Sequence, residues 1–122
     1  ASRPIKDEGN YTRRGEIYAL ITHRPEERSF DVVSFIAGYT HKAGSDVSVQ
    51  IGSDNYDLFT QGDTAWTRDG ETDRSLVGSI RKGSRMVTRG TSSRGTLTTD
   101  TYSLSGSSAA YEAIGKACGV SP

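Results

Sequence analysis

Few side chains of this chain could bind a metal ion. A structural zinc site takes four nitrogen or sulfur ligands, and the chain has two histidines, His23 and His41, and one cysteine, Cys118. Calcium loops carry acidic or amide residues at alternate positions before a glycine, and residues 54–57 (DNYD) lack this pattern. We therefore expect no metal site.

The spacing of the serines and carboxylates does not predict a catalytic site. No serine stands in the glycine-flanked elbow of hydrolases, and no phosphate-binding glycine loop is present. Asp57 and Asp63 flank Gln61 and Gly62 and would be candidates for acid–base work. Carboxylates at turns, however, commonly accept hydrogen bonds from nearby backbone amides. We expect a protein that is not an enzyme, with no catalytic residues and no cofactor.

The strongest chemical signal is a basic segment that continues into a predicted hairpin, residues 81–104. In a regular strand Val87 shares a face with two arginines, and Met86 and Thr88 point to the other face, so we expect an edge strand or a bulge. Two interpretations remain open: a surface that contacts an anion, a glycan or a membrane headgroup, or charges that protect a sheet edge. The candidate binding residues are Arg81, Lys82, Arg85, Arg89 and Arg94.

Composition favours one domain made of short strands. The 122 residues include 14 glycines and only 33% hydrophobic residues, which favours many turns. Basic and acidic residues balance at 15 each, whereas general nucleic-acid binders carry a basic excess, so we expect no nucleic-acid partner. No apolar run approaches the ~20 residues needed to span a bilayer, and the start of the chain shows no signal-peptide core.

The strands that must position these residues follow from alternation and turn signals. Residues 1–16 are polar and predict an irregular arm, and residues 17–122 predict a single β-sandwich domain. Gly95 supplies the positive φ that the hairpin loop requires. Trp66 is either a core residue or an exposed platform for a sugar. The predicted strands are residues 17–23, 31–39, 46–51 and 56–60, and the two arms of the hairpin.

Two segments predict helices. Over residues 70–82, an apolar stripe of Leu76, Val77 and Ile80 follows a cap at Asp69 or Thr72, and Gly83 ends the helix. Near residues 108–118, a cap at Ser107 or Ser108 precedes a second helix that Gly119 ends. Its predicted inner face carries Ala110, Ala113, Ile114, Ala117 and Cys118.

The position of Cys118 on the inner face of this predicted helix allows two interpretations. A lone thiol on the inner face of a helix is most often a small buried hydrophobic residue. Alternatively, it is half of a disulfide whose partner lies outside this chain.

Five sequence blocks carry a resemblance to a known family. In order along the chain they resemble the invasion-associated locus B family, from about Ile17 to Cys118. The resemblance implies an immunoglobulin-like antiparallel β-sandwich, found in small secreted proteins of Gram-negative bacterial envelopes and linked to entry into host cells. It implies no catalytic residues. The blocks are ITHRP (21–25), VSFIAGY (33–39), LFTQGDTAW (58–66), RGTSSRGT (89–96) and DTYSL (100–104).

The resemblance also changes the interpretation of Cys118. Members usually have a further N-terminal strand segment with a tryptophan and a cysteine, and this cysteine pairs with the one that matches Cys118. Neither residue occurs before Ile17 here. The resemblance thus implies that Cys118 is a disulfide half with its partner outside this chain. It further predicts an exposed sheet edge that could form a homodimer.

These observations lead to one functional expectation. We expect a non-enzymatic envelope protein that is periplasmic, associated peripherally with the outer membrane, or secreted, and that supports host-cell invasion by binding a host-surface protein or an anionic glycan. The alternative is a periplasmic enzyme or maintenance factor that acts on components of the cell envelope.

Overall fold

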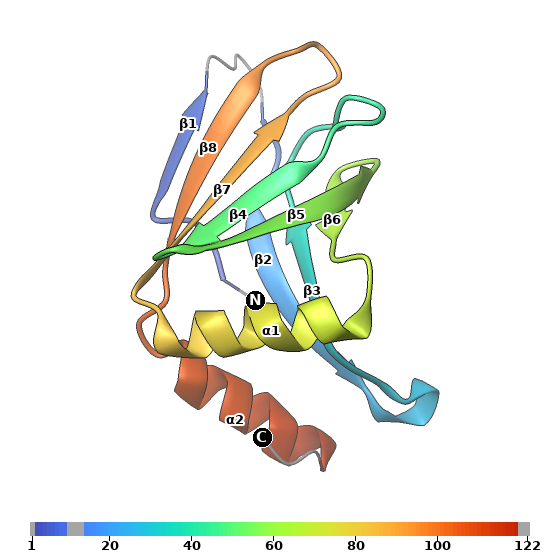
Figure 1. Ribbon diagram of the computed structural model, residues 1–122, viewed down its shortest axis with the longest axis vertical. Helices are drawn as coiled ribbons and strands as arrows, with labels where there is room; N and C mark the ends of the chain where they lie inside the picture. The colour runs from blue at the N-terminus through green and yellow to red at the C-terminus, as the bar shows by residue number, and fades with distance from the viewer. Residues whose placement is uncertain (1, 10–13, 120–122) are drawn as a thin grey trace.

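The described part of the computed structural model, residues 2–9 and 14–119, forms one antiparallel sheet and two α-helices (Figure 1). The order of strands across the sheet is β1-β8-β7-β4-β5-β6-β3-β2. The prediction of a mainly β fold with two helices is confirmed. The strands are β1 Lys6–Gly9, β2 Tyr18–Arg24, β3 Ser29–Ile36, β4 Val47–Ile51, β5 Asp54–Gln61, β6 Thr64–Trp66, β7 Arg85–Thr91 and β8 Leu97–Ser103; the helices are α1 Gly70–Lys82, α2 Ser107–Cys118 and a short 3-10 turn, η1 Pro25–Glu27.

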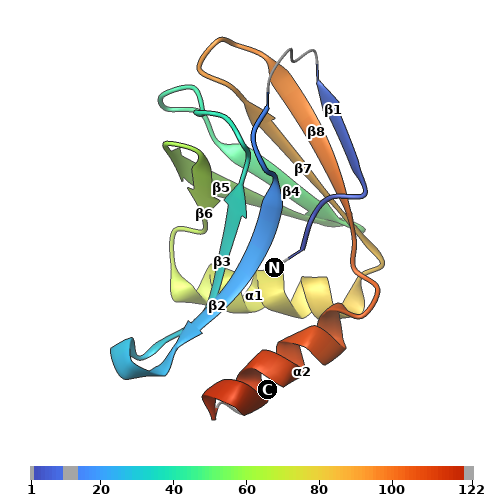
Figure 2. The ribbon, with the colours of Figure 1, turned by 180° about the vertical axis from the view of Figure 1, so that it is seen from behind.

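The layers of the fold are two halves of one curled sheet. β5 takes part in both halves, because its first part pairs with β4 and its last three residues pair with β6. Figures 1 and 2 show β8, β7 and β4 on one side and β2 and β3 on the other. Across the core between them, the rings of Phe35 and Tyr102 meet edge to face, with centroids 6.1 Å apart. Both rings are buried, and the apolar faces of the two halves therefore form a single core.

Residues 2–9 form part of the sheet, which corrects this part of the irregular arm predicted over residues 1–16; residues 14–16 form no strand, and residues 1 and 10–13 lie outside the described residues. Ser2 exchanges two backbone hydrogen bonds with Ala19 of β2, and Lys6–Gly9 pairs with β8 at the opposite end of the strand order. The polar composition hid this strand, because an exposed edge strand is held by its backbone and buries no apolar face. Residues 2–9 thus connect the two ends of the sheet. Pairing of an edge with a second copy of the chain stays a prediction.

Helix α1 forms as its sequence predicts. Leu76, Val77 and Ile80 are buried, and the Asp69 carboxylate accepts a hydrogen bond from the Thr72 backbone N–H at 2.7 Å. The hydrogen bond from the Thr72 backbone N–H lowers the pKa of the Asp69 carboxyl. Gly83 ends the helix with a φ of −80°, so a left-handed conformation is not its role. A Cβ at this position would come within 2.5 Å of Cγ2 of Ile51, and close packing requires the glycine instead.

Helix α2 is rotated relative to the prediction. Tyr111 and Gly115 are buried and Ile114 is half-buried, whereas the three alanines predicted to face inward, Ala110, Ala113 and Ala117, are exposed. The physical reason is that the single tyrosine ring packs edge to face against His23 and its hydroxyl donates to Asp31, contacts that the alanines could not make. Gly106, in the left-handed conformation, precedes the helix with no side-chain cap, which corrects the predicted serine cap. Gly119 ends the helix as predicted.

Strand β7 is neither an edge strand nor bulged, which corrects the interpretation of its charged face. It lies between β8 and β4, and its pairing with β8 is regular from Arg85 to Thr91. Met86 and Thr88 point into the core as predicted. Val87 is half-buried on the outer face because its cross-strand neighbours, Gln50 and Thr101, flank it on both sides. The central strand can therefore present arginines to solvent.

Candidate functional site

The five predicted binding residues do not form one cluster. Arg94 lies in the β7–β8 turn, and Arg89 lies on the outer face of the sheet, where its Nη1 donates to Oε1 of Gln50 at 3.2 Å. Arg81 faces α2. Only Lys82 and Arg85 line the same cavity.

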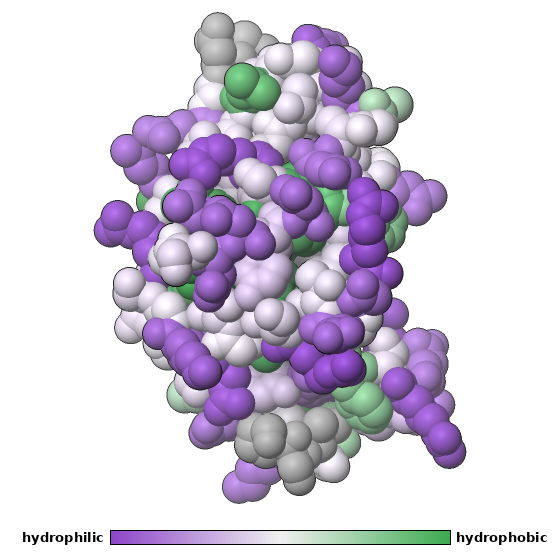
Figure 3. Space-filling view, viewed as in Figure 1, coloured by the Kyte–Doolittle hydropathy of each residue, from purple (hydrophilic) through white to green (hydrophobic). Residues whose placement is uncertain are grey.

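This cavity is an open groove of about 860 Å³ between α1 and the β4–β5 turn. Its volume is within the range of typical ligand sites. The elements around it lie on the near side in Figure 1, and Figure 3 shows this face covered mainly by hydrophilic and intermediate residues. We call it the cationic groove, because three exposed cations line it: Arg74, Lys82 and Arg85.

The cations of the groove form no close ion pair, although Arg74 lies near enough to Asp69 to help lower the pKa of that carboxyl. Among residues 2–9 and 14–119, no ion pair or hydrogen bond involves the side chains of Arg74, Lys82 or Arg85. The one carboxylate in the lining, Asp54, accepts a hydrogen bond from the Ser79 hydroxyl at 3.1 Å. An anionic ligand would therefore find cations with no competing partner.

A network of hydroxyl groups forms the floor of the groove. The Tyr56 hydroxyl lies 2.6 Å from Oγ of Ser79 and 3.2 Å from the carbonyl oxygen of Ser75. Ser79 in turn donates to Asp54. These bonds tie β5 to α1, so the donors and acceptors of the floor are held in place before any ligand binds.

Arg81 stabilises the contact between the two helices instead of lining the groove. Its guanidinium lies 4.8 Å above the centre of the Tyr111 ring and 3.1 Å from Oε1 of Glu112. Its Nε also donates to the Ser108 hydroxyl at 3.2 Å. The charge of Arg81 is thus already compensated within the molecule.

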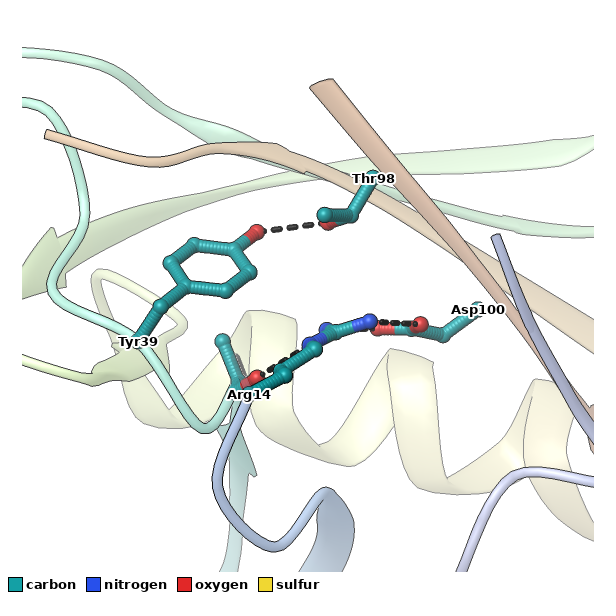
Figure 4. Close-up of polar contacts among 5 residues, drawn as sticks. Arg14, Tyr39, Thr98 and Asp100 are labelled. Atoms are coloured by element: carbon teal, nitrogen blue, oxygen red, sulfur yellow. Dashed lines mark hydrogen bonds and ion pairs between the residues drawn. The ribbon is translucent and has the colours of Figure 1, made fainter. Parts of the chain in front are cut away.

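A second arginine, which the sequence did not single out, forms a buried ion pair (Figure 4). Arg14 donates two hydrogen bonds of 2.8 Å to the Asp100 carboxylate and a third to the carbonyl of Ala37. Burial alone would lower the pKa of Arg14, but the hydrogen bond and charge of Asp100 outweigh it and raise this pKa. Beside the pair, the Tyr39 hydroxyl lies 2.6 Å from Oγ1 of Thr98. We call Arg14, Asp100, Tyr39 and Thr98 the Arg14 network.

The candidate acid–base residues are not brought together. The His23 side chain is fully buried, and its Nδ1 accepts a hydrogen bond from the Asp31 backbone N–H at 3.1 Å. Asp57 and Asp63 are exposed, unlike the buried His23 side chain. The second histidine, His41, is buried beside the carbonyl of Gly62, and burial lowers its pKa.

An apolar cavity of about 270 Å³ lies beneath α2, between β2 and the end of β8. Ile21, Leu104 and Tyr111 are among its lining residues. The Tyr111 hydroxyl donates to Asp31 at 2.6 Å, and burial together with this bond raises the pKa of Tyr111 to about 12. Cys118, at the end of α2, is half-buried and free, and a disulfide to a cysteine outside this chain stays a prediction.

Trp66 is neither a buried core residue nor a fully exposed platform for a sugar. It is half-buried in β6, a strand that the sequence did not predict, and its ring packs at 5.7 Å against Phe59 of β5. The Arg68 guanidinium lies 5.7 Å from the centre of the Phe59 ring. Trp66 thus belongs to an aromatic pair and not to the central core.

The described residues contain no group of three or more His, Cys, Asp or Glu side chains that could hold a metal ion. Over the same residues, neither helix is long and apolar enough to cross a membrane.

The family of the chain is shown by comparison with known families. The model of the Invasion associated locus B (IalB) protein family matches residues 2–115. The chain belongs to this family. Its membership supports an invasion-associated bacterial protein and confirms the resemblance seen in the sequence. No curated protein and no solved structure shows significant similarity to the chain.

The sequence predicted two of the three groove cations, Lys82 and Arg85, but not Arg74. A signal was present, because Arg74, Gly78 and Lys82 recur every four residues on the predicted helix and so share one side of it. The contribution of the β4–β5 turn had no such signal, since it depends on how α1 packs against the sheet.

Proposed function

We propose that this protein is a non-enzymatic component of the bacterial envelope, periplasmic, bound peripherally to the outer membrane or secreted, that supports host-cell invasion by binding an anionic ligand in the cationic groove. Family membership supports the link to invasion. The observation that carries the binding role is the convergence of Arg74, Lys82 and Arg85 on one groove, where none of the three forms an ion pair and Asp54 is the one carboxylate in the lining.

The positive charge of this protein is concentrated locally, at the groove. The whole chain has no net charge, so it does not attract anions in general. Within the groove, three cations and a fixed hydroxyl floor offer both attraction and directed hydrogen bonds. Arg81 and Arg89 contribute less, because each already has a partner inside the protein.

The test is charge reversal in the bacterium, with a matched control on the same strand. A deletion strain would be complemented with the wild-type gene, with Arg85→Glu or with Arg89→Glu, and attachment to host cells would be counted. We expect Arg85→Glu to lower attachment and Arg89→Glu to leave it near the wild-type value. Equal attachment by all three strains would contradict a binding role for the groove.

A parallel measurement separates binding from envelope maintenance. The same strains would be tested for growth under osmotic and detergent stress. If the deletion strain is sensitive to both stresses and Arg85→Glu restores resistance but not attachment, the groove acts in binding. If loss of attachment always accompanies envelope sensitivity, the link to invasion is indirect and the proposal is wrong.

A further inference from the structure

We propose that the cationic groove binds an extended acidic saccharide that lies along α1, with its closest approach to the protein at Gly78. This inference rests on the proposed function, because it names the ligand class for the same groove.

Gly78 is a costly residue in the middle of α1 that packing does not explain. Glycine is among the least favourable residues in a helix interior. A Cβ at Gly78 would meet no heavy atom within 4 Å, so alanine would fit without a clash. Gly83 is the opposite case, because Ile51 leaves no room there for a Cβ. Since Gly78 lines the groove, its missing side chain leaves the helix backbone open to a ligand.

The spacing of the cations on α1 indicates the length of the ligand. Arg74, Gly78 and Lys82 stand at i, i+4 and i+8 of one helix, so a rise of about 12 Å separates the two cations. A single phosphate or sulfate would contact both only if the two side chains bent toward each other along the helix. The ligand that fits carries acidic groups at intervals, with an uncharged stretch that rests on Gly78. A saccharide chain with one acidic group on every second ring has this form.

The floor of the groove favours a saccharide over a compact anion or a membrane surface. Sugar hydroxyls can both donate and accept hydrogen bonds, as Ser79 and Tyr56 do. The Asp54 carboxylate accepts from hydroxyl groups but repels a dense negative charge. Arg85, from the first residue of β7, adds a cation beyond those of the helix. A recessed groove also suits a chain better than a flat bilayer.

The test uses the full chain and measures calorimetric binding and thermal unfolding together. The probes are a hyaluronan octasaccharide, a neutral cellodextrin octasaccharide, inorganic phosphate and vesicles with anionic phospholipid. We expect binding of the acidic octasaccharide only, and we expect this binding to weaken with added salt. Binding of the neutral saccharide with equal affinity, or binding of phosphate or vesicles alone, would overturn the inference.

The decisive variant is Gly78→Ala, because its effects on folding and binding should have opposite signs. We expect Tm to rise by about 3–5 °C, as alanine favours the helix, and octasaccharide affinity to fall roughly tenfold, which corresponds to about 1.4 kcal/mol. Gly70→Ala, in the same helix but outside the groove lining, is the control and should leave affinity unchanged, because its Cβ would meet Nη1 of Arg74 only at an ordinary contact distance of 3.6 Å. A Gly78→Ala protein with higher Tm and undiminished affinity would overturn the role of Gly78.

A second variant does not depend on the glycine. The double variant Arg74→Gln, Lys82→Gln should keep its Tm and lose binding of the octasaccharide. If the wild-type protein fails to bind any acidic saccharide while Arg85→Glu still lowers host-cell attachment, the saccharide inference fails and the binding function stands.

Discussion

The two arginine sites of this protein differ in what surrounds the charge. The Arg14 side chain is only 11% exposed and directs three hydrogen bonds to Asp100 and Ala37. The cations of the groove are exposed and form no ion pair or hydrogen bond among the described residues. A buried charge must be fully paired for the fold to be stable, whereas an exposed charge costs little and remains free for a ligand. Charges for stability and charges for recognition are thus kept apart.

The Arg14 network also lies where the fold most needs a connection. Arg14 precedes β2, at one end of the strand order, and Asp100 lies on β8, near the other end, 86 residues further along the chain. The pair therefore holds together two sheet halves that share no ladder at this point. The groove cations hold nothing together, and their removal should leave the fold intact.

Asp100→Asn should have the largest effect, because it leaves the Arg14 guanidinium buried without its counter-charge. We expect the free energy of unfolding to fall by about 3–5 kcal/mol, measured by urea denaturation. Asp57→Asn, an exposed carboxylate on β5, is the matched control and should change it by less than about 0.5 kcal/mol. A loss below about 1 kcal/mol for Asp100→Asn would show that the pair does not stabilise the fold.

Tyr39→Phe tests the neutral part of the same network. The substitution removes a hydroxyl 2.6 Å from Oγ1 of Thr98 and leaves this buried oxygen without that partner. We expect a loss of about 1–3 kcal/mol in unfolding free energy. Tyr18→Phe, in the half-buried first residue of β2, is the control and should be near neutral. Equal stability of both variants would argue against a role for the Tyr39 hydroxyl.

The dependence of stability on pH should report on buried His41. Burial lowers its pKa below the ordinary value of 6.5, so in the window below pH 6.5 the unfolded chain binds more protons than the folded one. Its contribution to stability is complete above pH 6.5 and is lost as the pH falls toward the lowered pKa, at up to about 1.4 kcal/mol per pH unit. The measurement is urea unfolding of the wild type and of His41→Gln between pH 4.5 and 7.5. Parallel curves for the two proteins would contradict this contribution.

Neutralising a groove cation should have the smallest effect on stability. Arg74→Gln or Arg85→Gln should change the free energy of unfolding by less than about 0.5 kcal/mol, because neither exposed side chain has an ion pair or hydrogen bond to lose. The measurement is the urea midpoint at low and at physiological salt. A destabilisation above about 1 kcal/mol would mean that the groove also holds the fold together, and the comparison with Arg14 would fail.

The sequence predicted the features that depend on neighbours along the chain. The prediction of helix α1 was correct because its apolar stripe and its Asp69 cap both depend on residues close together in the sequence. The predicted buried face of α2 was wrong because Tyr111 contacts Asp31 and Arg81, which lie far from it in the sequence. Strand β1 was missed because its residues bury no apolar face, and pairing with β8 decides its conformation.

The groove was half predicted for the same reason. Lys82 and Arg85 are close in sequence and were noticed together as part of one basic segment. The β4–β5 turn enters the groove through tertiary packing that no local pattern encodes. The Arg14 network was invisible in the sequence, since its two charged members come from opposite ends of the chain.

The pairing of the first strand with the last has a consequence for the order of assembly during synthesis. Lys6 leaves the ribosome long before Thr101, its partner in the sheet, has been made. Strands β2 to β7 can pair before β8 has been made, whereas β1 cannot. The outer backbone of β8 stays unpaired until residues 6–9 bind to it. Open edges are where nascent chains join one another in error. The docking of residues 2–9 therefore covers the backbone of β8 and leaves a short, charged strand at that edge of the finished sheet.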